Sequence, residues 1–312
     1  MVESKHKWKA WLYLAPAIVL LLIFTVWPIF NTVHVAFQEG YNELSLIGGE
    51  STKYGFGNFV DVVKYPGFVT ALKNTLLLCV LTVPISTILA LVIAVCLNSI
   101  KPLSRFLQTI YFLPYVTNSI AIGMVFAAMF NIVGSNIGGE AELITTSGII
   151  NNVIEFFGGE PVNWINSGSS YWANITVMVV YIVWNALPFK ILILLGGLQS
   201  VNKQYYDAAK VDGTSRFRVF TKITVPLLSP MLAYVVITGF IGGFKEYSSI
   251  VGIFGDDMGH SGNREMDTMV GYIQDNIDRW QGRASAAALI LFGIIFIVTM
   301  INLYVSKKKT HY

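Results

Sequence analysis

The sequence predicts an all-α, polytopic membrane protein in which six helices cross the bilayer. Hydrophobic residues make up 54% of the 312 residues and charged residues only 12%, whereas an ordinary soluble domain has about 25% charged residues. Six apolar segments reach the ~20 residues that a helix needs to cross the hydrocarbon core. Their approximate ranges are 10–36, 70–97, 107–130, 171–197, 223–244 and 284–305. We therefore expect one transmembrane domain over residues 1–312.

The first apolar segment, 10–36, follows a basic N-terminus, as a secretory signal peptide does. Its apolar stretch is longer than the core of about 7–15 residues that a signal peptide carries. It also contains Pro16 and Pro28 and ends without a small-x-small cleavage site. These features predict a retained transmembrane helix.

The third and fourth apolar segments carry polar and aromatic side chains among apolar neighbours. Such side chains line pathways for polar solutes, but they also anchor helices at the interface or hydrogen-bond neighbouring helices. Both interpretations stay open for each residue. With two residues that follow the fifth segment, the candidate pathway residues are Asn118, Tyr181, Trp184, Asn185, Glu246 and Tyr247.

Two charged side chains near these candidates are interpreted separately. Lys190 lies one or two turns from the end of the fourth segment, so we expect its ammonium group to snorkel to the interface. Glu246 follows Lys245 just beyond the fifth segment. Its carboxylate either accepts hydroxyl groups of a solute or forms an ion pair with Lys245, and the sequence leaves both open.

A polar, basic loop at 198–222 separates the fourth and fifth segments and contains an unusual spacing of small residues. The motif Asp-Ala-Ala at 207–209 is followed, after three residues, by Gly213. Asn202 can cap a short helix that ends at this glycine, and a basic second helix follows. Small residues allow the backbone of another protein to approach, so this helix-turn-helix predicts a docking loop. An ordinary connection between two spans would not need this spacing.

The fifth segment begins with two prolines, Pro226 and Pro230, directly after the docking loop. Proline removes a backbone donor and clashes with the preceding turn of a helix. We expect a kink at this position, although single prolines are also tolerated in membrane helices.

The basic residues lie on one side of a six-helix topology. They precede the first segment, occur at Lys101 and Arg105, crowd into 203–222 and end the chain at 307–309. The opposite side includes 131–170, which contains four Glu and no Lys or Arg. By the positive-inside rule, the basic side faces the cytoplasm and both termini are cytoplasmic. The net charge of +3 therefore reflects topology and gives no indication of nucleic-acid binding.

Motifs for nucleotide or metal binding are missing from the sequence. There is no phosphate-binding GxxxxGK[ST] loop, and the four histidines are scattered without metal-ligand spacing. We therefore expect no cofactor, metal or ATP hydrolysis on this chain and no covalent chemistry. If transport is ATP-driven, another chain must bind the nucleotide.

The docking loop closely resembles the EAA loop of binding-protein-dependent ABC importer permeases. The similarity covers Asp207-Ala-Ala-x3-Gly213 and continues through Ile223 to Val225 and Pro226. Asp207 stands where the family usually has Glu, and Val225 stands where it usually has Leu. Over most of 8–306, further stretches of the sequence resemble motifs of this family and occur in the same order as in the family.

The opening APAIVLLLIFTVWPI and the stretch DGTSRFRVFTKITVPLLSP resemble the carbohydrate branch of this family. They are similar to the first permease of the pair in importers of the maltose, glycerol-phosphate and multiple-sugar type. Two external stretches depart from the family pattern. The sequence GIFGDDMGHSGNREMDT replaces a usual Gly-Gly-Pro turn, and 135–148 is longer than the common pattern.

The resemblance implies a type I ABC importer permease of the bacterial cytoplasmic membrane that takes up a di- or oligosaccharide. Its implied partners are a second homologous permease, two ATP-binding subunits that hold ATP and Mg²⁺, and an extracytoplasmic solute-binding protein. The implied ATPase-coupling residues are Tyr206, Asp207, Ala208, Ala209, Asp212, Gly213, Arg216 and Phe217.

Two other classes of protein are considered beside this one. An ion-coupled secondary transporter of a polar solute is the main alternative, but it usually has inverted repeats and ionisable groups in mid-span. The sequence has no clear repeat and no mid-span carboxylate. A membrane enzyme would need convergent acids and bases. The nearest cluster, Asp256, Asp257, Glu265 and Asp267, is more simply a solvated or cation-binding loop.

Overall fold

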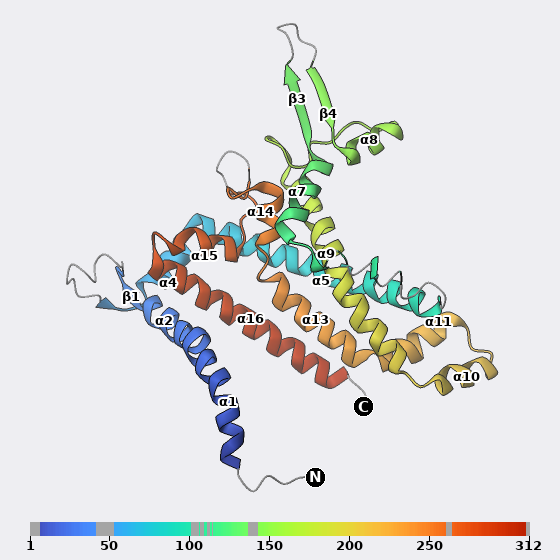
Figure 1. The fold of residues 1–312 in the computed structure, drawn as a ribbon. Coiled ribbons are helices and arrows are strands. Elements are labelled where there is room, and N and C mark those ends of the chain that lie inside the picture. Colours follow the sequence, from blue (N-terminus) through green and yellow to red (C-terminus); the bar gives the residue numbers. More distant parts are fainter. Residues whose placement is uncertain are drawn as a thin grey trace. The chain divides into compact units, whose positions relative to one another are not determined.

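The computed structural model describes residues 7–41, 53–100, 106, 109–110, 113, 115–136, 143–259 and 264–309. Within this part the chain is mostly helical, and its strands form two short antiparallel sheets (Figure 1). The chain divides into two compact units. One comprises Met1–Phe68 and Tyr272–Phe292, and the other comprises Val69–Gly271 and Gly293–Tyr312.

The first unit begins with one long helical stretch that contains a π-helical turn. Pro28 has no N–H group to continue the helix ladder, and the π-helical turn lies just before it. A two-stranded sheet pairs Gln38 with Tyr54 and Glu39 with Lys53. The elements are α1 (Lys7–Leu21), η1 (Leu22–Val26), α2 (Trp27–Ala36), β1 (Gln38–Glu39), β2 (Lys53–Tyr54) and α4 (Gly57–Lys64).

Asn58 fastens α4 to the end of the N-terminal helical stretch. Its Nδ2 atom donates to the carbonyl oxygens of Ala36 at 3.0 Å and Gln38 at 2.8 Å. In the same unit, the Arg283 guanidinium lies 5.0 Å from the centre of the Tyr65 ring. These polar and cation–π contacts hold together a unit whose N-terminal helix leaves its apolar side chains exposed.

The second unit is built on three long helices, α5, α9 and α13. One cluster of buried side chains, around Leu78, Tyr181 and Ile250, joins α5, α9 and α14. Another, around Leu194 and Val235, joins α9 to α13 and α5. Helices α5, α15 and α16 run across the division between the units. The elements are α5 (Pro66–Ser99), α7 (Ser119–Phe130), β3 (Ile132–Asn136), β4 (Leu143–Ser147), α8 (Ile149–Phe156), α9 (Tyr171–Ser200), α10 (Lys203–Val211), α11 (Arg216–Val219), η2 (Phe220–Thr224), α12 (Val225–Leu227), α13 (Ser229–Gly243), α14 (Ser248–Phe254), α15 (Met269–Ile277) and α16 (Gln281–Lys309).

Helices α7 and α14 touch through two glycines. A Cβ atom added to Gly123 would lie 2.7 Å from the Cα atom of Gly252, and one added to Gly252 would lie 2.8 Å from the Ile120 carbonyl oxygen. Both distances are shorter than van der Waals contact, so only hydrogen fits at these positions. The close approach buries Ile250 and Ile253 of α14 against the rest of this core.

Four helices in the described part are long and apolar enough to cross a membrane. They are Trp11–Ala36, Pro66–Ser99, Tyr171–Ser200 and Gln281–Lys308, and a bent pair, Arg216–Leu227 with Ser229–Gly243, adds a fifth. The predicted third span, 107–130, contains α7, but part of 107–118 lies outside the described residues. The all-α class is confirmed, while the count of six and the single domain remain predictions.

The buried side chains of Asn74 and Thr75 of α5 hold a distant segment by hydrogen bonds. Asn74 Nδ2 donates to the carbonyl oxygens of Glu265 at 2.8 Å and Asp267 at 2.9 Å, and its Oδ1 accepts from the Tyr171 hydroxyl at 2.7 Å. Thr75 Oγ1 accepts from the backbone N–H of Met269 at 2.9 Å. The segment before α15 is therefore fixed to the N-terminal part of α5.

We expect Asn74→Leu to lower the free energy of unfolding by about 3 kcal/mol, because two carbonyl oxygens and a tyrosine hydroxyl lose their buried partner. Thermal unfolding in detergent measures the change. Asn98→Leu, at the exposed end of the same helix, serves as the control and should alter stability by no more than about 0.5 kcal/mol. Equal losses in the two variants would contradict the role given to Asn74.

Candidate functional site

The docking loop is a short helix closed by a left-handed glycine. Asn202 caps α10 by accepting the backbone N–H of Gln204 at 3.0 Å. Gly213 has a φ angle of +64°. Its N–H donates to the Lys210 carbonyl at 3.1 Å, and the N–H of Thr214 donates to the Ala209 carbonyl at 3.0 Å. This is the arrangement that ends a helix where glycine permits a positive φ.

Large apolar side chains project from this loop. Tyr205 is 55% exposed, Val211 88% and Phe217 77%. Large apolar side chains exposed close together in the sequence are a feature of interaction sites. Of the eight residues predicted to couple to an ATPase, Ala209 is buried, Tyr206 is half-buried and the other six are exposed. The loop therefore presents most of these residues to its surroundings.

A sharply bent helix leads from the docking loop into the core of the second unit. The helix over Arg216–Leu227 meets Ser229–Gly243 at 68°. Pro226 and Pro230 lie on either side of the bend, and each lacks the N–H group that would continue the helical ladder. The kink expected from the two prolines is present. The loop is thus connected covalently to α13 through a fixed angle.

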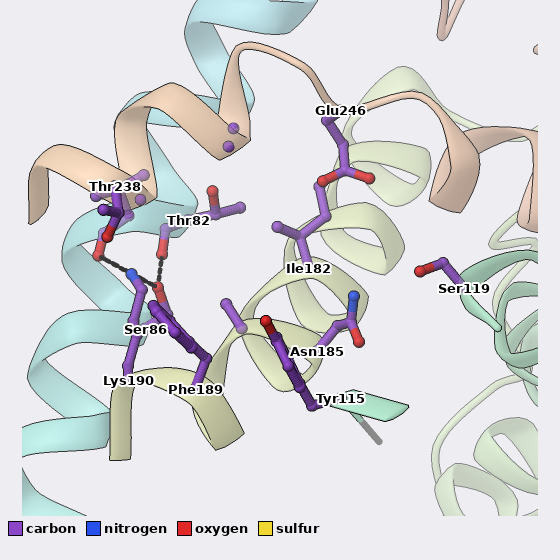
Figure 2. Close-up of a pocket in the computed structure, with 15 residues that line it drawn as sticks. Thr82, Ser86, Tyr115, Ser119, Ile182, Asn185, Phe189, Lys190, Thr238 and Glu246 are labelled. Atoms are coloured by element: carbon purple, nitrogen blue, oxygen red, sulfur yellow. Dashed lines mark hydrogen bonds between the residues drawn. The ribbon is translucent and has the colours of Figure 1, made fainter. Parts of the chain in front are cut away.

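A cavity of about 310 Å³ with a mixed polar and apolar lining lies among α5, α9, α13 and the start of α7. Figure 2 shows its labelled side chains, which come from all of these elements. Its lining mixes hydroxyl, amide, charged and aromatic groups with a glycine-rich face of α13. The lining residues are Thr82, Val83, Ser86, Tyr115, Ser119, Ile182, Asn185, Ala186, Phe189, Lys190, Thr238, Gly239, Gly242, Gly243 and Glu246.

Lys190 is held inside the unit. Its side chain is 4% exposed, and Nζ donates to Ser86 Oγ at 2.6 Å (Figure 2). Nζ also donates to Thr87 Oγ1 at 3.0 Å and to the Val83 carbonyl oxygen at 3.3 Å. The expectation that Lys190 snorkels to the interface is wrong, because hydroxyl groups of α5 supply its acceptors. All three ammonium protons are used, so this buried cation joins α9 to α5.

Glu246 borders the cavity just beyond the end of α13. The Ser249 hydroxyl donates to its Oε1 atom, and burial raises the pKa of its carboxyl group above the ordinary value. Among the described residues, no ion pair joins Glu246 to Lys245. The structure therefore gives no support to the ion-pair interpretation and places the carboxyl group on the cavity wall.

Two aromatic rings form a flat surface on another part of the lining. The rings of Tyr115 and Phe189 are stacked, with centroids 5.7 Å apart and an interplanar angle of 17°. Phe189 also lies 6.5 Å from the ring of Tyr234. Apolar faces beside a few hydrogen-bonding groups are typical of a site for a small polar organic molecule.

The six candidate pathway residues divide between the cavity and the packing around it. Asn185 and Glu246 line the cavity. Asn118 instead caps α7 by accepting the N–H of Ile120 at 2.9 Å, and the buried Tyr181 donates its hydroxyl to the Ser119 carbonyl at 2.8 Å. The remaining two also lie outside the lining: Trp184, 5.3 Å from Phe126 between ring centres, and Tyr247, at the start of α14.

The sequence-based candidates did not include several lining residues. Thr82 and Ser86 are four residues apart on α5 and face the cavity together. This spacing of hydroxyl groups in an apolar helix was a signal that could have identified them. Tyr115 and Thr238 had no such signal, because they reach the cavity from separate elements.

Comparisons with known proteins agree along nearly the whole chain. A family model described as binding-protein-dependent transport system inner membrane component matches residues 69–311. The lactose transport system permease protein LacF of Rhizobium radiobacter is 28% identical over 295 residues, which are 94% of this chain and 91% of that protein. The arabinooligosaccharides transport system permease protein AraP of Halalkalibacterium halodurans is 30% identical over 306 residues, or 97% and 89%.

Solved structures share the fold. A chain of a bacterial ABC transporter that imports the acidic polysaccharide alginate matches with a TM-score of 0.77 at 20% identity, over 98% of both chains. A chain of a bacterial alginate ABC transporter in complex with an alginate pentasaccharide-bound periplasmic protein matches with a TM-score of 0.80 at 20% identity. This match covers 98% of this chain and 96% of the other. The predicted permease fold is thereby confirmed.

Proposed function

Because this chain belongs to the family of binding-protein-dependent transport system inner membrane components, we propose that it is a permease subunit of an ATP-driven importer for a di- or oligosaccharide. It is a multi-pass membrane protein of a transport system. The observation that carries the finer proposal is the continuous connection from a docking loop through a bent helix to a cavity with a mixed polar and apolar lining. A solute pathway and a coupling element occur in one chain.

A carbohydrate fits the chemistry of the cavity. Sugar rings have apolar faces and hydroxyl edges, and the lining offers the stacked rings of Tyr115 and Phe189 beside Ser119, Asn185 and Glu246. The names of LacF and AraP, which are similar over more than nine-tenths of this chain, also support a sugar substrate. We propose that a solute-binding protein delivers the sugar from the extracytoplasmic side.

The docking loop is proposed to contact a separate ATP-binding subunit on the cytoplasmic side. Its apolar residues Tyr205, Val211 and Phe217 are exposed. Contact with a protein partner would be more favourable for these side chains than contact with water. The excess of basic residues in the loop supports this orientation by the positive-inside rule. We propose that ATP and Mg²⁺ bind to the two ATPase subunits, so that this chain itself holds no cofactor. A second homologous permease is proposed to complete the pathway.

Coupling in this proposal is mechanical. A push on α10 from an ATPase subunit displaces the Gly213 turn and the helix from Arg216 to Leu227. The proline-bounded bend transmits this displacement to α13, whose Thr238 and Gly242 line the cavity. The cavity then closes to one side of the membrane and opens to the other. The same residues line it in the inward-open and the outward-open state.

Family membership argues against an ion-coupled secondary transporter. The test is affinity purification of this chain from its native membrane with identification of the bound proteins, followed by uptake assays in proteoliposomes. We expect recovery of a second permease and an ATP-binding protein, and uptake of lactose or arabinooligosaccharide probes that requires ATP. Recovery of this chain alone, with uptake driven by an ion gradient, would overturn the proposal.

A further inference from the structure

A second cavity, separate from the one lined by Asn185 and Glu246, lies beside the docking loop. It measures about 620 Å³ and is enclosed by the C-terminal ends of α5 and α9 and by α10, α11 and η2. One part of its wall is apolar and includes Leu198, Val219 and Phe220. Another part carries the basic side chains of Lys210 and Arg216. The wall is therefore amphiphilic, in contrast to a purely polar anion site.

The charge of this cavity is positive. Among the described residues, its lining contains no Asp or Glu. Lys210 is balanced by Asp207, whose Oδ1 atom lies 3.4 Å from Nζ on the exposed face of α10. Within the described part of the chain, no carboxylate pairs with Arg216. An unpaired guanidinium in a cavity wall attracts a phosphate group, which its planar donors can bind through two oxygens.

Hydroxyl groups add hydrogen-bonding capacity near this guanidinium. The side chains of Tyr206, Thr214 and Thr224 line the same cavity, and the Tyr206 hydroxyl lies 3.4 Å from Thr224 Oγ1. Hydroxyls and a cation together suit a phosphodiester. The neighbouring apolar wall would stay in contact with water if the ligand were inorganic phosphate, whereas an acyl chain would cover it and gain the free energy of apolar burial.

We propose that this cavity binds an anionic phospholipid of the cytoplasmic leaflet, with the headgroup phosphate at Arg216 and an acyl chain along Val219 and Phe220. The choice of leaflet rests on the proposed orientation of the docking loop. The binding itself does not require that the chain transport a sugar. The lipid would bridge the docking loop and the ends of α5 and α9, where the loop joins the membrane helices.

The test measures lipid binding to the purified transporter that contains this chain. Native mass spectrometry with phosphatidylglycerol and, separately, phosphatidylcholine gives the affinity for each lipid. We expect the wild-type protein to prefer phosphatidylglycerol, and Arg216→Gln to bind it about fivefold more weakly. Arg218→Gln removes the same charge two residues away, outside the cavity lining, and should bind as the wild type does. Arg216→Lys should retain most of the affinity.

Each contrary outcome overturns the proposal. Equal affinity of the wild-type protein for the two lipids would exclude a specific anionic site, whether or not the variants fold. Equal weakening by Arg216→Gln and Arg218→Gln would indicate a diffuse electrostatic effect. Displacement of phosphatidylglycerol by millimolar inorganic phosphate would identify a soluble-anion site. Because lipid binding is measured without transport, failure here is distinct from failure of the importer assignment.

Discussion

Gly213→Asp is expected to abolish ATP-driven uptake while the chain stays inserted in the membrane. The φ angle of +64° at this residue favours glycine, yet a Cβ atom there would meet no other atom within 4 Å. The fold can therefore accept the side chain at a modest conformational cost. The new carboxylate instead enters the surface through which, in the proposed function, the docking loop contacts an ATPase subunit. Uptake in proteoliposomes and the amount of co-purified ATPase measure the effect.

Gly158→Asp is the matched control for this experiment. Gly158 also has a positive φ angle, +81°, and open space around its Cβ position, but it follows α8 and lies far along the chain from the docking loop. We expect this variant to transport normally and to keep its ATPase. If both variants lost uptake equally, backbone strain would explain the result and the coupling role of the loop would be contradicted.

Gly242→Trp is expected to reduce uptake to background by filling the cavity of the second unit. Gly242 lines the cavity from α13, and no atom lies within 4 Å of its Cβ position. An indole ring can thus enter the space of about 310 Å³ without displacing the backbone. Assembly with the ATPase and its basal ATP hydrolysis should persist. Uptake and ATP hydrolysis are measured on the same reconstituted transporter.

Gly196→Trp provides the comparison for the cavity experiment. Gly196 is an exposed residue of α9, has no atom within 4 Å of its Cβ position and does not line the cavity. Uptake by this variant should remain close to that of the wild type. Wild-type uptake by Gly242→Trp would show that the sugar does not pass through this cavity, without affecting the family assignment.

Local features of the fold were predictable from the sequence, because each depends on residues that are close together in the chain. The cap at Asn202, the left-handed turn at Gly213 and the bend between Pro226 and Pro230 follow from the chemistry of those residues. The long apolar helices follow from their length and composition in the same way.

The cavity was less predictable, because its wall depends on how separate helices pack. The position of Lys190 near the end of its helix predicts that its side chain reaches the interface. That position does not reveal that Ser86 and Thr87, more than a hundred residues earlier, supply its acceptors. Tyr115 and Phe189 similarly stack only because two elements meet. Contacts of this kind require the tertiary arrangement.

The backbone contact between Gly123 and Gly252 limits how this protein can evolve. Many unfavourable substitutions are rescued by a second change that makes room, but here neither partner has a side chain to shorten. A methyl group at either position meets the backbone of the opposite helix, which no substitution can remove. The two codons are therefore expected to stay invariant in a library selected for function, whereas Gly196 and Gly293, with open space around them, should accumulate replacements freely.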